Sequence, residues 1–553
     1  MTRRTIRIEQ APELTRAPLA DAYVHSFERI ASLYDFHPYR PDGWRERLEW
    51  LDSRSHPNAS KEALSEVLIA YNERIGNSQE AIQGAKELAQ SGTVAVVGGQ
   101  QAVAFTGPLL VLHKAVTILS AARRAERELG RRVVPVFWVA GEDHDWDEVN
   151  HTYGITKEQE IQKIKINVKQ DEPPRTSVSY VSMNQLAWED ALEQFEGGLL
   201  DTEFKPDLII TLRKAFAESS SPSDCFARIM ASLFGKHGLV LVDSADPAVR
   251  SLEREMFQQL IRRRADYGNA LEQGRSAVEQ AGFTAEAEVR SDSLQLFVLH
   301  EGERLLMYGH AGGGFSDRKG RLPLTEEQLL HYASEEPERL SNNVLTRPVM
   351  QEYLFPVLAT VLGPSEVAYW GLLRHAFHSL DMKMPIVVPR TSFTMIEGTV
   401  HKNLEKYGVA LGQALNGQEL EKLKMDWLAR QDQWGVEARF AAAEDAVNTQ
   451  YGPLLEMIEE IQPALRKLGD TNLLKIQEQI AFLKQKTMDA LQSRHEAGVR
   501  QFERIGRSLL PLGKPQERVY NGFVYLSKYG TDWLDQLVEQ ELDLHGGHYA
   551  VYL

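Results

Sequence analysis

The chain has 553 residues, of which 43% are hydrophobic and 25% charged, and its formal net charge is −16. This is ordinary globular composition, and the length predicts roughly three to four domain-sized units. The acidic balance argues against nucleic acid or an anionic membrane as the main partner.

Cysteine usage and apolar runs bear on the compartment. Cys225 is the single cysteine, so an intramolecular disulfide is excluded and a reducing environment is favoured. The first residues contain no apolar signal-peptide region, and no apolar run reaches the roughly eighteen residues that span a membrane. We therefore expect a cytoplasmic protein without a membrane partner.

Residues 1–90 are expected to be mostly helical. Apolar residues recur at helical spacing in Trp44–Ser53 and in Lys61–Ser91. We expect both segments to pack on a sheet formed by the next part of the chain.

Residues 93–150 predict a βαβ unit. Two short β-rich runs, Thr93–Val97 and Val133–Val139, flank a helix of about twenty residues. This order is typical of a right-handed crossover between parallel strands. The fold class is therefore α/β.

Polar clusters follow both strands, at 98–101 and at 141–145. Ligands of parallel sheets bind beyond the carboxyl ends of the strands, so we expect the two clusters to face one pocket. Gly99, Gln100 and Gln101 are the binding candidates of the first cluster. Since no GxxxxGK[ST] motif occurs and no GxGxxG motif follows this strand, the glycines fit a tight strand-to-loop turn equally well.

The start of the helix is a candidate anion site. It opens Phe105-Thr106-Gly107-Pro108-Leu109, with Thr106 as the expected N-cap and Pro108 near the first turn. An anion is stabilised at such a position, so Thr106 and Gly107 are further binding candidates.

The acidic run after the second strand contains the catalytic candidates Glu142, Asp143, His144 and Asp145. Crowded like charges raise each other's pKa or recruit a cation. The alternative is a solvated loop that caps the next helix. Residues this close in sequence cannot all reach one ion without a special turn, so we expect no dedicated protein metal site and Mg²⁺ to arrive with a nucleotide. Asn150 is a binding candidate at the end of the run.

Two later segments are expected to be strands. Gly238–Asp243 is short and apolar, which predicts a buried parallel strand. Asp243 is then either a pocket residue or the cap of the helix after Pro247. Leu294–His300 and Arg304–Gly309 predict an antiparallel hairpin.

The strand Ile386–Val388 ends in Arg390, Thr391 and Ser392. Arginine offers a planar fork of donors suited to phosphate or carboxylate, so these three residues are binding candidates. Three other polar residues either bind substrate or brace loops: Asn342, Arg347 and Glu366.

Residues 415–508 predict a helical coiled-coil hairpin, because apolar residues alternate at spacings of three and four. The break is expected at Leu468–Thr471, with Pro463 kinking the first helix. A hairpin of this length seldom buries its apolar stripe alone, so we expect a homodimer. Residues 509–553 are expected to pack back on the core.

Several separated motifs resemble one family. They are GGQQAVAFTGPL, PVFWVAGEDHDWDEVNH, SNNVLTRP, YLFPV, LGPSEVAY, PIVVPRTSF and PLGKPQERVYN. In this order they look like the bacillithiol-synthesis cysteine ligase family, BshC, over nearly the whole chain. One departure is His113, where relatives are expected to carry an aromatic residue, so no catalytic role is assigned to it.

The resemblance implies an ATP-dependent ligase that joins cysteine to glucosaminyl malate in the last step of bacillithiol biosynthesis, with ADP or AMP as the product. It implies a Rossmann-like core over residues 1–414, connective-peptide insertions near 151–235 and 275–345, and a dimerising coiled coil. Asp143 or His144 is expected to take the amine proton. Arg518, Tyr520 and Asn521 are candidate nucleotide contacts; the alternative is that the segment Gln516–Asn521 locks the tail to the core.

Two other classes of function remain open. One is a metal-dependent hydrolase or transferase built on the acids around His144. The other is a non-catalytic nucleotide-binding assembly protein whose coiled coil recruits other enzymes. A nucleotide requirement separates the ligase from the first, and turnover separates it from the second.

Overall fold

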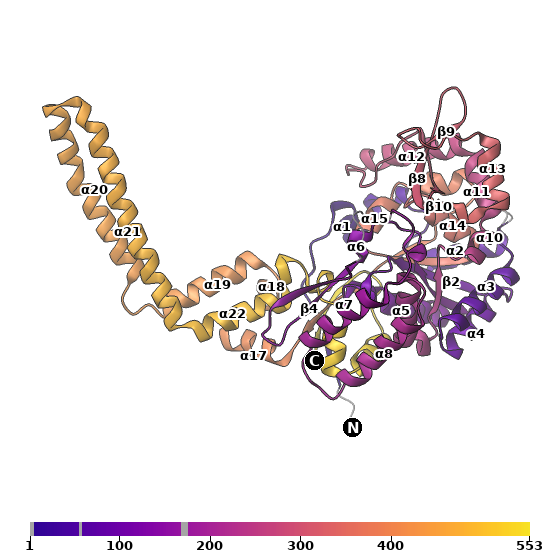
Figure 1. Ribbon diagram of the computed structural model, residues 1–553, viewed down its shortest axis with the longest axis horizontal. Helices are drawn as coiled ribbons and strands as arrows, with labels where there is room; N and C mark the ends of the chain where they lie inside the picture. The colour runs from indigo at the N-terminus through magenta and orange to yellow at the C-terminus, as the bar shows by residue number, and fades with distance from the viewer. Residues whose placement is uncertain (1–4, 55–57, 168–174) are drawn as a thin grey trace. The chain divides into compact units, whose positions relative to one another are not determined.

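The computed structural model describes residues 5–54, 58–167 and 175–553 (Figure 1). Within it the chain forms two compact units. One combines Met1–Met395 with Lys514–Leu553, and the other is Ile396–Gly513.

The second unit is larger than the expected hairpin of residues 415–508. It also contains the helices α17 (Gly398–Tyr407) and α18 (Leu411–Ala414), because both contact α22 (Glu496–Leu509). The boundaries therefore lie at 396 and 513.

The core of the first unit is a parallel sheet of five strands in the order β12-β11-β2-β3-β6, and all neighbours run parallel. Its strands are β2 (Val94–Gln100), β3 (Val133–Val139), β6 (Val240–Asp243), β11 (Val357–Leu362) and β12 (Ile386–Pro389). The strands predicted from apolar runs are confirmed. Such runs fit because a parallel sheet is covered on both faces.

The two faces of the sheet contribute to different hydrophobic clusters. Val96 and Phe137 join one cluster, whereas Val97 and Trp138 join the other, as the alternation of side chains along a strand requires. Helix α5 (Leu110–Leu129) contacts β2 and β3, while α3 (Lys61–Arg74) and α4 (Gln79–Glu87) contact β6.

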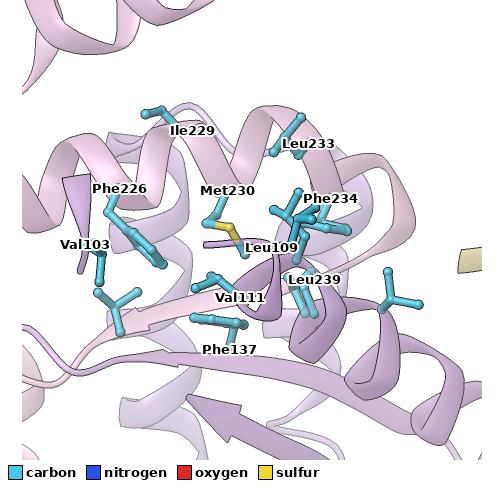
Figure 2. Packing of buried hydrophobic residues seen from close by; sticks show 14 of the residues in the cluster. Val103, Leu109, Val111, Phe137, Phe226, Ile229, Met230, Leu233, Phe234 and Leu239 are labelled. Carbon is cyan, nitrogen blue, oxygen red and sulfur yellow. The ribbon is translucent and has the colours of Figure 1, made fainter. Parts of the chain in front are cut away.

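Figure 2 shows part of the first cluster, where side chains of α9 (Pro222–Phe234) lie over the sheet beside Leu109, Val111 and Phe137. Cys225 lies in the same helix and is buried, and burial raises the pKa of its thiol well above the usual range. Its role is therefore packing.

The segment Lys61–Ser91 forms two helices instead of one. Gly76, with φ of 71°, separates α3 (Lys61–Arg74) from α4 (Gln79–Glu87). The segment predicted at Trp44–Ser53 lies in α2 (Pro41–Ser53). All three helices contact the sheet, α2 through β11 and β12.

Two long insertions lie in the connections between strands of the parallel sheet. The first, near 151–235, includes residues outside the described ranges, and it begins with an antiparallel pair, β4 (His151–Ile155) and β5 (Ile161–Lys165). It continues with α7 (Gln185–Gly198), α8 (Lys205–Glu218) and α9.

The second insertion is an antiparallel sheet in the order β10-β7-β8-β9. Its strands are β7 (Ser293–His300), β8 (Glu303–Gly309), β9 (Phe315–Ser316) and β10 (Leu340–Asn342). The predicted hairpin is confirmed.

The remaining helices of the first unit cover these sheets. They are α1 (Pro18–His25), α6 (Trp146–Val149), α10 (Pro247–Leu252), α11 (Arg254–Arg262), α12 (Arg264–Gln280), α13 (Glu326–Glu335), α14 (Arg347–Leu354), α15 (Pro364–Trp370), α16 (Arg374–Ser379), α23 (Phe523–Tyr529) and α24 (Asp532–Glu539).

A third sheet, in the order β1-β14-β13, contains both ends of the described chain. Strand β1 (Arg7–Gln10) pairs antiparallel with β14 (His548–Tyr552), and Arg7 lies opposite Tyr552. The other edge is β13 (Ser392–Ile396).

The second unit is built around two long antiparallel helices, α20 (Val436–Ile461) and α21 (Arg466–Arg494), which lie side by side (Figure 1). Bonds from Gln477 to Asn448 and from Lys484 to Glu437 fix the antiparallel pairing. Helix α19 (Gly417–Arg430) contacts α22 in the same unit.

The turn between the long helices was predicted wrongly at Leu468–Thr471. It lies at 462–465, because the residue before a proline is disfavoured in helical conformation, and Gln462 is extended with φ −156° and ψ 109°. Pro463 therefore ends the first helix and does not kink it. Gly469 lies inside α21, where a Cβ atom would come within 2.4 Å of Leu455 and 2.7 Å of Ile458.

Apolar side chains remain exposed on these two helices. They are Leu454, Met457, Ile461, Leu468, Leu474, Phe482 and Leu483. In the ranges that the structure describes, no helix is both long enough and apolar enough to cross a bilayer, and this includes α20 and α21.

Candidate functional site

A cavity of about 270 Å³ lies at the carboxyl end of the central strand β2. Strand β2 has β3 on one side and β11 on the other. The strands that follow it in the chain are therefore added on both sides of β2, and the strand order reverses there. Such a switch in strand order leaves a crevice where ligands of open α/β sheets bind.

The cavity wall comes from four strand ends and from the C-terminal segment. It is formed by Gly99, Gln100, Gln101, Leu110, Lys114, Ala140, Asp143, Val344, Arg347, Gly363, Pro364, Ser365, Glu366, Tyr369, Arg390 and Arg518. The structure thus brings the polar clusters after β2 and β3 to one cavity.

A lysine and a glutamate, Lys114 and Glu366, form an ion pair in the cavity wall. Lys114 lies in the first turns of α5, and its side chain is only 1% exposed. Its Nζ donates to the carbonyl oxygen of Gly99 at 2.7 Å and to Oε2 of Glu366. Burial lowers the pKa of Lys114, and the pairing with Glu366 opposes that shift.

Glu366 is held from three directions at the start of α15. It accepts the backbone N–H of Gly363 at 2.8 Å, and Arg347 lies 3.4 Å from its Oε1. Burial alone would raise the pKa of Glu366, but Lys114 and Arg347 outweigh burial and lower it. Arg347 also donates to the hydroxyl of Tyr369 at 2.9 Å, while its buried Nε makes no hydrogen bond within the described residues.

Asp143 joins the acidic loop to the end of β2. Its Oδ2 accepts the side-chain amide of Gln101 at 2.6 Å, and its Oδ1 accepts the backbone N–H of His144 at 2.7 Å. Burial would raise the pKa of Asp143, but the bond from Gln101 and the charge of Arg304 lower it overall. A carboxylate is therefore kept ionised at the cavity wall.

The other members of the acidic run turn to different partners. Asp145 caps α6 by accepting the N–H of Glu148 at 3.2 Å. Buried Glu142 accepts from Arg250 at 2.5 Å. The predicted catalytic roles of Glu142 and Asp145 are therefore not supported, and the capping alternative describes Asp145.

His144 is the remaining member of the run, and its Nδ1 lies 3.2 Å from Nη1 of Arg304. Across the parts of the chain that the structure describes, no three histidine, cysteine or acidic side chains are grouped as metal ligands.

Two family profiles match the chain over nearly its whole length. Residues 1–391 match the N-terminal Rossmann-like domain of bacillithiol biosynthesis BshC, and residues 393–553 match its C-terminal coiled-coil domain. The chain belongs to the BshC family. Its fold thus agrees with the predicted Rossmann-like core and coiled coil.

Individual BshC relatives align almost end to end. A protein of Bacillus cytotoxicus named "Putative cysteine ligase BshC" is 35% identical over 532 residues, which is 96% of this chain and 97% of the relative. Proteins of the same name from Bacillus cereus and Bacillus thuringiensis subsp. konkukian are each 33% identical over 534 residues, with the same coverage.

Arg390 of this BshC family member lines the cavity, but its fork of donors is already engaged. Its two terminal nitrogens donate to Glu517 at 2.7 and 2.6 Å, and Ser392 donates to the same carboxylate at 3.3 Å. Nδ1 of His113 lies 2.9 Å from Glu517. The expectation that Arg390 and Ser392 bind a ligand is therefore corrected, since a buried internal carboxylate occupies both.

Thr391 is likewise internal. Its backbone N–H donates to the hydroxyl of Thr117 at 3.2 Å. Arg518, in contrast, is exposed at the cavity wall, and within the described ranges it makes no ion pair.

The expected anion site before α5 is a packed junction. Helix α5 begins at Leu110, so Thr106 is not its N-cap; Thr106 lies in a tight turn with φ of 67°. The side-chain amide of Asn521 donates to the carbonyl oxygens of Phe105 and Gly107 at 2.7 and 2.9 Å. Thr106 and Gly107 are both buried, so this junction is not open to an anion from solvent.

Tyr520 and Asn521 are 1% and 0% exposed, so the alternative that they lock the tail to the core describes them. Asn150 is also buried and lies 3.4 Å from Asp147. Asp243 accepts from Ser179 at 2.6 Å, and Asp246, not Asp243, caps the helix α10.

Sequence reasoning missed Lys114 and Tyr369. The available signal for Lys114 was a lysine within the mostly apolar run Val111 to Ala122, all of which the structure buries. A charged side chain at a position of that kind is retained only with a partner or a ligand. Arg347 and Glu366, whose roles were left open, both belong to the cavity.

Proposed function

We propose that this protein is an ATP-dependent ligase that forms an amide between the carboxyl group of cysteine and the amine of glucosaminyl malate, as the last step of bacillithiol biosynthesis. The observation that carries the proposal is the cationic cavity at the strand switch, in a chain whose relatives are named as cysteine ligases. ATP is anionic, and both substrates carry carboxylate groups.

The cavity offers donors for such anions. Lys114, Arg347 and Arg518 line it, and Nε of Arg347 has no bond to a described residue. Arginine forks suit carboxylate and phosphate oxygens, and lysine supplies a point charge. We therefore assign this cavity to the carboxylates of the substrates or to the phosphates of ATP.

Amide formation removes one oxygen from the cysteine carboxylate and one proton from the attacking amine. ATP with Mg²⁺ supplies the activation, since transfer of a phosphoryl or adenylyl group to that oxygen makes it a leaving group. In this proposal Lys114 stabilises negative charge on the reacting oxygens, and such stabilisation is usually the largest protein contribution to catalysis. In this proposal the ionised Asp143 accepts the proton that the amine loses.

The exposed apolar side chains of α20 and α21 support a homodimer through the hairpin. Ile461, Leu468 and Phe482 are 72%, 66% and 58% exposed, which is costly for a monomer. A second copy of the same hairpin is the proposed cover. Light scattering of the wild-type chain should give twice 62.5 kDa, and Phe482→Ser should weaken the dimer.

Mass spectrometry tests the chemistry. The full chain is incubated with glucosaminyl malate, cysteine, ATP and Mg²⁺, and the thiol product is followed together with the nucleotide. Product that requires every component, with ADP or AMP formed in equal amount, would support the ligase. Binding of ATP without turnover would instead favour the assembly protein, and tight binding of a transition metal without any nucleotide requirement would favour the hydrolase or transferase.

A further inference from the structure

Arg304, from strand β8 of the second insertion, reaches the acidic loop that follows β3. Its guanidinium lies over the ring of Phe297, 3.9 Å from the centroid. Its Nε donates to the hydroxyl of Ser341 at 2.8 Å, and Nη2 donates to the carbonyl oxygen of Asn342. These contacts fix the group, and the remaining nitrogen, Nη1, lies 3.2 Å from Nδ1 of His144.

This contact determines where the proton of His144 sits. A guanidinium has donors and no acceptor, so the atom that it faces must provide a lone pair. Nδ1 of His144 is therefore the acceptor, and the proton of the neutral ring lies on Nε2. An Nδ1–H tautomer or an imidazolium would place two N–H groups against each other.

The surrounding charges act in the same direction. Burial and then Arg304 lower the pKa of His144; Asp143 and Asp145 oppose them, and Arg175 adds to them. Burial lowers the pKa of Arg304 itself only to about 10, so Arg304 stays charged at neutral pH. His144 thus stays neutral and Arg304 stays charged, as the hydrogen bond between them requires.

The side chain of His144 is 36% exposed. Its Nε2 makes no hydrogen bond to any residue that the structure describes. One N–H of this ring is therefore free to meet a ligand beside Asp143, which lines the cavity.

We propose that Arg304 is a positioning residue that holds His144 as the Nε2–H tautomer, so that His144 acts on the substrate as a hydrogen-bond donor and does not accept the proton of the amine. This inference rests on the proposed ligase function. It assigns His144 to an oxygen of the acyl or phosphoryl group, and it leaves Asp143 as the acceptor at the cavity wall.

Nuclear magnetic resonance of the full chain labelled with ¹⁵N-histidine tests the tautomer without any substrate. His144→Gln identifies the signals of this ring. We expect the Nε2–H pattern at pH 7.5 in the wild-type chain, and its loss together with a higher pKa in Arg304→Met. An Nδ1–H pattern or an imidazolium in the wild-type chain would overturn the proposal, and this spectrum decides even if Arg304→Met fails to fold.

Ser341→Ala is the matched control. It removes another partner of Arg304 and leaves the contact with His144 in place. We expect its His144 signals to match those of the wild type. If Ser341→Ala changed the tautomer as much as Arg304→Met, loosening of the insertion would explain both, and the specific role of Arg304 would be refuted.

Turnover tests the donor role. Glutamine keeps an N–H donor but cannot take a proton in this pH range, so His144→Gln should keep kcat/KM within about tenfold of the wild type, whereas His144→Ala should lose about 10²–10³-fold. Equal loss in both variants would indicate a base and contradict the proposal. Absence of turnover from the wild-type chain would contradict the ligase function, while the tautomer measurement would stand.

Discussion

Two charged clusters border the cavity at the ends of neighbouring strands, and they differ in what their charges contact. In the cluster of Arg390 and Glu517, both side chains are below 5% exposed and the two form a paired fork. In the cluster of Lys114 and Glu366, the glutamate is 21% exposed and both residues line the cavity. The hydrogen-bonding groups of the first cluster are taken up by Arg390 and Glu517 themselves. The second cluster can still contact a ligand in the cavity.

The comparison teaches that a charged residue after a strand is not by itself a sign of a site. Arg390 has the ideal chemistry for an anion, yet Glu517, far along the chain, occupies it. Lys114 was not among the residues predicted from the sequence to bind a ligand, yet it lines the cavity. Substitutions in the two clusters should therefore affect different quantities.

The largest expected effect is on stability, in Glu517→Gln. This change leaves the buried Arg390 without its anion, which costs about 3–5 kcal/mol of unfolding free energy. Chemical denaturation of the first unit's transition measures it. Turnover at a temperature where the variant is folded should be close to that of the wild type; a specific loss of turnover with unchanged stability would place Glu517 in the site and break the comparison.

The next effect is on catalysis, in Lys114→Met. We expect kcat/KM to fall about 10²–10³-fold, the usual result of removing a donor from a developing negative charge, with a much smaller change in stability than in Glu517→Gln. Lys236→Met is the control, because Lys236 is exposed and pairs with Asp535 away from the cavity. Equal turnover in Lys114→Met and Lys236→Met would remove Lys114 from the mechanism.

A third carboxylate shows what burial does without an ion pair. Burial raises the pKa of Asp243 from 3.8 to about 6, against bonds from Ser179 and from the backbone N–H of Ala245. A raised carboxyl pKa means that the folded state holds the proton longer, so stability is full below pH 3.8 and is lost as pH rises through 6.

The corresponding prediction compares Asp243→Asn with the wild type across pH. The wild type should lose about 2–3 kcal/mol from this group between about pH 4 and 7, and the variant should lack that loss. Denaturation curves at several pH values measure the difference. Parallel pH profiles for the two proteins would show that Asp243 is ionised in the folded state throughout.

The smallest effect is expected at the rim, in Arg518→Gln. An exposed charge contributes only about 0.2–1 kcal/mol, so KM for the anionic substrate should rise about two- to five-fold with kcat unchanged. The difference should shrink at high salt. A large fall in kcat would mean that Arg518 moves into contact with the reacting atoms.

The sequence predicted the core strands and the place of the cavity well, because both follow from local patterns. Short β-branched apolar runs such as Val133–Val139 are typical of buried strands, and parallel strands send their carboxyl ends to one edge. The family motifs lie on these same elements. The second unit's helices were evident from their apolar spacing.

Individual side chains were predicted less well, since their partners are distant in sequence. Glu142 and Asp143 are adjacent, yet one turns to Arg250 and the other to Gln101. Thr106 suggested a helix cap, but Asn521 holds its neighbours in a turn. Gly469 suggested a break, but the helix continues through it to pack closely on Leu455. No local pattern contains these contacts.

The pairing of β1 with β14 has a consequence for synthesis on the ribosome. Strand β1 is synthesised more than five hundred positions before its partner, with Arg7 opposite Tyr552. Contacts of such sequence separation form late, and an unpaired strand edge promotes aggregation in the meantime. Strand β1 must therefore be shielded until β14 has been synthesised, whereas the hairpin of α20 and α21 can fold earlier, from local contacts.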